Sequence, residues 1–92
     1  MKKYIHSHLI ELDIVKEELK AFEIIKISKG VMNSGEPFLT LYVALNANKY
    51  IIQVDTTHYY ILDSECQRIL KTRSWKKFKE KINDIERIAS LL

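Results

Sequence analysis

The stretch from Phe38 to Leu62 constrains the fold more than any other part of the chain, because three short runs of β-branched and aromatic residues alternate there with turn-forming residues. The runs cover residues 38–45, 49–54 and 59–62, and each is followed by Asn or Asp. β-Branched and aromatic side chains fill a pleated surface, and Asn and Asp favour tight turns. The stretch therefore predicts an antiparallel strand meander.

A further strand is predicted ahead of this meander. Ile25 and Ile27 alternate with polar residues, which indicates a strand with one face in contact with solvent. Gly30 permits a bend or bulge, and the Gly- and Pro-containing loop after it would join this strand to the next as a wide hairpin. Residues 38–45 are apolar at almost every position, so we expect a central strand that is covered on both faces or faces a partner.

The N-terminal part has two interpretations. Its apolar residues recur at spacings of three or four, at Leu9, Leu12, Val15, Leu19 and Phe22. This spacing predicts a helix over about residues 8–22. Alternation between His8 and Val15 predicts instead a strand there, with Asp13 capping a shorter helix over residues 14–22.

The C-terminal third predicts a broken helical segment. Ser64 and Gln67 have the spacing of a capping box, which predicts a helix start, and a break is expected at residues 72–74. From Trp75 onward the chain shows the clearest helical period. The apolar positions are Trp75, Phe78, Ile82, Ile85, Ala89 and Leu92, with Ile88 and Leu91 beside them, and Asp84 and Arg87 are spaced to pair.

These elements predict one compact α+β domain over residues 1–92. It has an N-terminal helix, a three- to four-stranded antiparallel meander and a C-terminal amphipathic helix packed on one sheet face. Cys66 is alone, so no internal disulfide can form, which is typical of a reducing compartment. No apolar run is long enough for a signal peptide or a membrane span. We therefore expect a cytoplasmic protein, or one of the host-cell cytoplasm if the source is a virus, with no membrane contact.

The residues capable of chemistry do not form a recognisable motif. His6, His8, His58 and Cys66 match no zinc spacing, and the two glycines form no phosphate-binding loop. Asp55, His58 and Asp63 lie near predicted strand ends, where acid-base groups are often held, but turns contain such residues for conformational reasons alone. Cys66 beside a helix start could be a reactive thiol, although a packed cysteine is the simpler interpretation. We expect no enzyme activity, metal, cofactor or small-molecule substrate.

The basic residues give the strongest lead to a partner. The formal net charge is +3, and residues 64–81 hold seven basic and two acidic side chains. The seven are Arg68, Lys71, Arg73, Lys76, Lys77, Lys79 and Lys81. Gathered around the start of the last helix, they would form a site for phosphate or another anion. The simpler interpretation is a solvated lysine face that keeps the protein soluble.

The tyrosines offer a second candidate surface. Tyr42, Tyr50, Tyr59 and Tyr60 could stack on nucleic-acid bases if they share an exposed sheet face, but Lys49 is the only cation interleaved with them. The residues expected at a protein interface are Tyr42, Tyr50, Tyr60 and Trp75.

The order of helix, meander and helix, with lysines at the last helix, is similar to that of double-stranded RNA-binding domains. The chain departs from that family because no glycine lies between Asp63 and Trp75, and bulky Phe78 and Ile82 occupy the helix. The first functional expectation is a non-enzymatic protein-interaction module, such as a homodimer or a bacterial or viral accessory factor. The alternative is a nucleic-acid-binding domain that uses the basic surface of residues 68–81.

Overall fold

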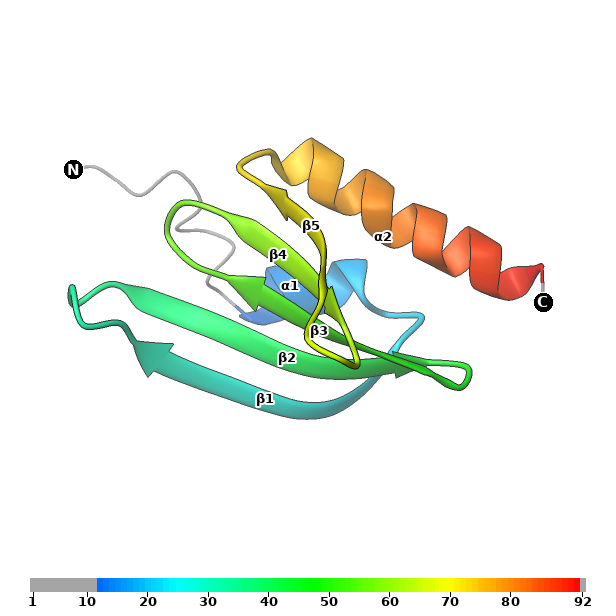
Figure 1. Cartoon of the computed structure of the whole chain (residues 1–92), viewed down its shortest axis with the longest axis horizontal. Coiled ribbons are helices and arrows are strands. Elements are labelled where there is room, and N and C mark those ends of the chain that lie inside the picture. The colour runs from blue at the N-terminus through cyan, green and yellow to red at the C-terminus, as the bar shows by residue number, and fades with distance from the viewer. Residues whose placement is uncertain (1–11, 92) are drawn as a thin grey trace.

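The computed structural model describes residues 12–91 of the 92-residue chain. Within these residues two helices and five strands follow in the order α1, β1 to β5, α2 (Figure 1). Their bounds are Leu12–Glu18 for α1, Glu23–Val31 for β1, Pro37–Leu45 for β2, Asn48–Val54 for β3, Tyr59–Asp63 for β4, Arg68–Thr72 for β5 and Trp75–Ser90 for α2. The strands form one antiparallel sheet in which each strand pairs with the next along the chain.

The predicted α+β class and the helix packed on the sheet at the C-terminal end are confirmed, but the sheet has five strands rather than three or four. The helix predicted over residues 8–22 corresponds, in its described part, to the shorter α1. Residues before Leu12, including Leu9, lie outside the described residues. Val15, Leu19 and Phe22 of the predicted apolar stripe are buried, so this part of the pattern is confirmed.

The hydrophobic core lies on one side of the sheet, where both described helices pack (Figure 1). Alternate residues of the central strands point to this side, which we call the helix face, and most of them are fully buried. The core consists of Val15, Leu19, Phe22, Leu39, Leu41, Val43, Ile52, Val54, Tyr59, Ile61, Phe78, Ile82 and Ile85. The two ends of the described chain thus close over one face of the meander.

The opposite side of the sheet is not covered by either described helix, and we call it the open face. Cross-strand pairing places on it Lys26, Phe38, Thr40, Tyr42, Ile51, Gln53, Tyr60, Leu62, Arg68 and Lys71. The Tyr42 side chain is 37% exposed. Neither described helix covers this face of β2, although Thr40 on it is only 5% exposed, and the alternative that β2 faces a partner stays a prediction.

The bulge of β1 lies at Ile25, where the pairing register shifts between Ile24 and Lys26, and not at Gly30. Gly30 serves a different purpose, because it pairs with Phe38 of β2 and the Phe38 ring lies against it. A Cβ atom at this position would come within 2.5 Å of the Phe38 Cζ atom. Glycine is thus required by close packing on the open face.

The helix start predicted at Ser64 and Gln67 is wrong, because residues 64–67 form the turn between β4 and β5. The Asp63 carboxylate takes the role expected of Ser64: its Oδ1 atom accepts hydrogen bonds of 2.9 Å from the backbone N–H groups of Glu65 and Gln67. Cys66 has a positive φ of 65°, which a helix start would not tolerate. The following residues therefore continue the sheet as β5.

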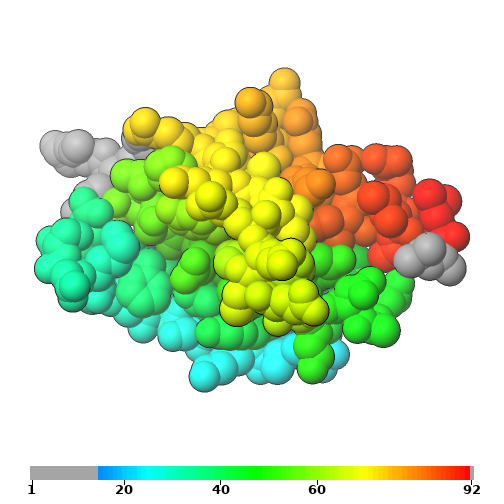
Figure 2. Space-filling model, viewed as in Figure 1, coloured from blue at the N-terminus to red at the C-terminus, as the bar shows by residue number. Residues whose placement is uncertain are grey.

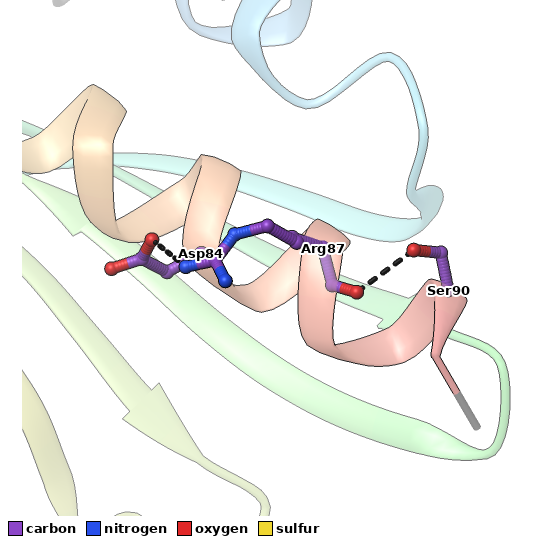
Figure 3. A network of polar contacts seen from close by, with 3 residues as sticks. All are labelled: Asp84, Arg87 and Ser90. Carbon is purple, nitrogen blue, oxygen red and sulfur yellow. Dashed lines mark hydrogen bonds and ion pairs between the residues drawn. The ribbon is translucent and has the colours of Figure 1, made fainter.

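Residues 72–74 do not break a helix, because a strand precedes them, but α2 begins at Trp75 as expected. Ser74 is its N-cap, with Oγ accepting a 3.1 Å hydrogen bond from the backbone N–H of Lys77. Farther along, the guanidinium of Arg87 pairs with Asp84 at 2.7 Å, and the hydroxyl of Ser90 donates to the Arg87 carbonyl (Figure 3). Ile88 and Leu91, expected beside the buried stripe, are 55% and 76% exposed.

Candidate functional site

Three of the seven predicted basic residues meet around one shallow hollow, which we call the basic hollow. It has a volume of about 540 Å³ and is lined by His58, Lys71, Thr72, Arg73, Ser74 and Lys77. Figure 2 shows β5 and the turn before it (yellow) at the front of the molecule, with the start of α2 (orange) above them. The hollow lies where the edge strand β5 passes into α2.

The local chain path explains why these three cations meet. Lys71 is near the end of β5, and the backbone N–H of Ser74 donates a 3.0 Å hydrogen bond to the Thr72 hydroxyl, which fixes the turn into α2. Ser74 then caps the helix through Lys77. Arg73 and Lys77 are thereby held on either side of the cap, next to the strand that carries Lys71.

The basic hollow has an unbalanced positive charge. No acidic residue is among the described residues that line it. The ion pairs formed within the described residues, Glu17 with Lys20 and Asp84 with Arg87, leave its cations unpaired. The N-terminus of α2 adds partial positive charge at the same place. The positive charges around the hollow repel one another. A bound anion would offset this repulsion and would therefore be held favourably.

The other four basic residues are distributed differently. Arg68 pairs with Leu62 and so lies on the open face. Lys81 is one helical turn beyond Lys77 and lies on the same side of α2. Lys79 lies on the opposite flank, with its ammonium group 5.6 Å from the centre of the Trp75 ring, and Lys76 is exposed on the outer side of the helix. The seven cations therefore do not form one continuous patch.

The aromatic residues expected at a protein interface are divided between the two faces of the sheet. Tyr42 and Tyr60 lie on the open face. Tyr50 lies on the helix face, with its ring 6.3 Å from that of Phe22. Trp75 is half-buried against Phe78, with 5.4 Å between the ring centres, and also contacts the ring of Tyr59. The four residues thus do not share a surface.

The open face combines tyrosines with lysines from neighbouring strands. The ammonium group of Lys26 on β1 lies 5.7 Å from the centre of the Tyr42 ring, and that of Lys71 on β5 lies 6.0 Å from the Tyr60 ring. Sequence inspection missed these pairs because it considered only cations adjacent to the tyrosines in the chain. The antiparallel register, which places Lys26 beside Tyr42 and Lys71 beside Tyr60, is the signal that could have found them.

A second hollow, which we call the aromatic hollow, lies on the open face next to the first. Its volume is about 380 Å³, and it is lined by Met32, Phe38, Gln53, Val54, Asp55 and Tyr60. Tyr60 contacts the residues of the basic hollow, since its ring centre is 5.9 Å from that of His58 and it lies beside Lys71. The two hollows are therefore neighbours across Tyr60.

Asp55 has a fixed geometry in the β3–β4 turn. Its Oδ1 atom accepts hydrogen bonds from the backbone N–H groups of Thr57 and His58, at 2.8 and 2.7 Å, and from the Thr57 hydroxyl at 3.0 Å. Burial acts to raise the pKa of Asp55, but these hydrogen bonds and the nearby His58 outweigh it, so the pKa is lowered. Burial, the Asp55 charge and a hydrogen bond with its carboxylate raise the pKa of Tyr60. At neutral pH the pair is a carboxylate and a phenol.

Of the residues considered for catalysis, Asp55 and His58 lie in the same turn, but Asp63 does not join them. Asp55 and Asp63 lie at opposite ends of β4, and each carboxylate is engaged in its own turn. Cys66 is exposed in the β4–β5 turn and is not beside a helix start. His6 and His8 lie outside the described residues. Within residues 12–91, no three His, Cys, Asp or Glu side chains are grouped closely enough to hold a metal ion.

Neither described helix is both long enough and apolar enough to cross a membrane. Comparison with protein-family models, with curated proteins and with solved structures found no match for this chain.

Proposed function

We propose that the protein binds single-stranded nucleic acid, without catalysis, through the basic hollow and the adjoining open face of the sheet. The observation that carries this proposal is the gathering of Lys71, Arg73 and Lys77 around one hollow beside Tyr60. The single cysteine favours an intracellular setting, where nucleic acid is available.

The charge of the basic hollow suits a phosphate backbone. Three unpaired cations and His58 surround it, with no described acidic residue in its lining. Each phosphate that a lysine or arginine neutralises releases a bound counterion, which makes the affinity fall steeply with salt. A nucleic-acid backbone carries further phosphates beyond those in one hollow. The open face has two more cations, Arg68 and Lys26, that could contact them.

The tyrosines of the open face favour a single strand over a duplex. Tyr42 on β2 and Tyr60 on β4 are separated by β3, and their strands are about 10 Å apart. Bases in a duplex are stacked on one another and are not available to protein rings, whereas unpaired bases stack on exposed aromatic side chains. Lys26 and Lys71 beside the rings can contact the backbone of the same strand.

This function is tested by fluorescence anisotropy with labelled single-stranded oligonucleotides of mixed sequence at increasing salt. We expect micromolar binding at low salt with a clear dependence on salt concentration. A triple variant with Lys71→Gln, Arg73→Gln and Lys77→Gln should weaken binding more than ten-fold. It should also reduce the slope of log affinity against log salt by about 2, because each lost phosphate contact contributes about 0.7 for a single strand.

The matched control replaces three exposed cations away from the basic hollow, Lys16, Lys20 and Lys29, by glutamine. It changes the net charge by the same amount, so it should retain most of the affinity if the site rather than the net charge binds the strand. Equal losses in the two triple variants, or no binding by the wild-type protein at low salt, would contradict the proposal.

A specific observation also favours self-association as a second candidate function. β1 is a nine-residue edge strand, and Ile25 and Val31 on it are 52% and 69% exposed, with Ile27 partly exposed between them. A long edge strand with apolar side chains can pair with the same strand of a second copy. Sedimentation at increasing protein concentration tests this: a dimer that Ile25→Lys and Val31→Lys abolish would support it, and a monomer at millimolar concentration would exclude it.

A further inference from the structure

The aromatic hollow has the composition of a small binding site. It holds the side chains of Met32, Phe38 and Tyr60 together with the polar groups of Gln53 and Asp55. Its volume of about 380 Å³ lies within the range of about 300–1,000 Å³ that is usual for ligand pockets. An apolar cavity with a few polar groups is the common form of a site for a flat heterocycle.

Two aromatic side chains from different strands are in its lining. Phe38 comes from β2 and Tyr60 from β4, and β3 runs between them with Gln53 paired to Tyr60. Strands separated by one other strand lie about 10 Å apart, which leaves room for one planar ring between two aromatic side chains. The Phe38 ring is held in place against Gly30, so this wall is formed before any ligand binds.

The polar groups define which heterocycle fits. The Asp55 carboxylate can only accept hydrogen bonds, and it accepts them from Thr57, His58 and the Tyr60 hydroxyl, so an amino group of a base would share or replace the contact with Tyr60. The Gln53 amide both donates and accepts, and its present contact with the Thr40 hydroxyl is long, at 3.5 Å. A carboxylate repels phosphate and carbonyl oxygens but accepts from the exocyclic amino groups of adenine, cytosine and guanine.

The position of the hollow connects it to the cations. Lys71 lines the basic hollow and lies over the Tyr60 ring, which lines the aromatic hollow. A phosphate at Lys71 and a base beside Tyr60 would thus belong to the same or adjacent nucleotides.

Building on the proposed function, we propose that the aromatic hollow receives one base of the bound single strand. Phe38 and Tyr60 contact its faces, and Asp55 accepts a hydrogen bond from its exocyclic amino group. The strand is therefore read at one position, with preference for bases that carry an amino group over thymine and uracil, whose carbonyl oxygens face the carboxylate.

The test compares the affinities of the full chain for labelled oligomers of dA, dC and dT of equal length, at one salt concentration. We expect dA and dC oligomers to bind at least five-fold more tightly than dT. The variant Asp55→Asn keeps the Oδ1 acceptor of the turn but adds an amide donor that pairs with carbonyl groups, so it should reduce or remove the preference. Phe38→Leu should weaken binding of all three, and Ile88→Ala on the exposed side of α2 provides a control away from the open face.

The outcomes separate this inference from the function on which it rests. Salt-dependent binding with equal affinity for the three oligomers would overturn the base site and leave the proposed function standing. No binding of any oligomer at low salt would overturn both. Because the base preference is measured on the wild-type protein, the test remains decisive even if a variant does not fold.

Discussion

The ammonium group of Lys71 lies 6.0 Å from the centre of the Tyr60 ring, on adjacent strands of the open face. A cation at the face of an aromatic ring is attracted by the ring quadrupole. The pair also joins two hollows with different properties, because Lys71 lines the basic hollow and Tyr60 the aromatic one. The phosphate and the base of a nucleotide would each have a suitable contact at this pair.

The tyrosines of the open face should contribute directly to binding of a single strand. We expect Tyr42→Leu and Tyr60→Leu each to weaken oligonucleotide binding about five-fold or more, because stacking on one base contributes about 1–3 kcal/mol. Tyr50→Leu makes the same replacement on the helix face and should leave the affinity unchanged. The measurement is fluorescence anisotropy, with circular dichroism to confirm folding; an equal loss in all three variants would exclude the open face as the stacking surface.

The close packing of Phe38 on Gly30 should make an alanine at position 30 unfavourable. The added Cβ would lie 2.5 Å from the Phe38 Cζ atom, so Gly30→Ala should lower the free energy of unfolding by about 1–3 kcal/mol. Phe38→Leu in the same chain should recover part of that loss in a double-mutant cycle read by urea denaturation. Gly35→Ala serves as a control, since its cost comes from a φ of 91° and Phe38→Leu should not relieve it.

The two sides of α2 should differ strongly in their effect on stability. Phe78 is fully buried and stacks with Tyr59 and Trp75, so Phe78→Ala should lower the free energy of unfolding by about 3–5 kcal/mol. Ile88 is largely exposed, and Ile88→Ala should change it by about 0.5 kcal/mol or less. Urea denaturation of both variants measures the difference; similar losses would show that α2 does not pack as described.

The turn held by Asp55 should make stability depend on acidity. Because the pKa of Asp55 is lowered in the folded state, its contribution is present above the unfolded value of about 3.9 and is lost as the pH falls through the folded value. The advantage of the wild-type protein over Asp55→Asn should therefore shrink as the pH falls below the unfolded value and through the lowered folded one. Urea midpoints across this range measure it, and an advantage that stays constant with pH would contradict the expected linkage.

The strands of the meander could be predicted because their boundaries depend on local signals. The turn at Asn46, whose φ is 57°, and the turn that Asp55 closes both use residues that favour such backbone conformations. The strand β5 was missed because Ser64 and Gln67 have capping-box spacing, and spacing alone does not show that Asp63 satisfies the same backbone groups first. The pairing of β5 with β4, which no local signal shows, decides between these two interpretations.

The candidate site could be predicted only in part. Lys71, Arg73 and Lys77 are close in the chain, so a basic segment was visible in the sequence. The other components depend on strand register: Lys26 reaches Tyr42 across 16 positions, and Phe38 lies beside Asp55 across 17. Pairings over such distances follow from the fold as a whole and have no local sequence signal.

The order of the sheet has a consequence for how the protein is made. Every strand pairs with its neighbour in the chain, so the sheet can form hairpin by hairpin as translation proceeds, and its contacts are local enough for rapid folding. The helix that supplies Phe78, Ile82 and Ile85 is synthesised after all five strands. Until this helix leaves the ribosome, the apolar helix face of the nascent sheet is partly exposed. A stalled chain that ends before Trp75 would therefore be prone to aggregate.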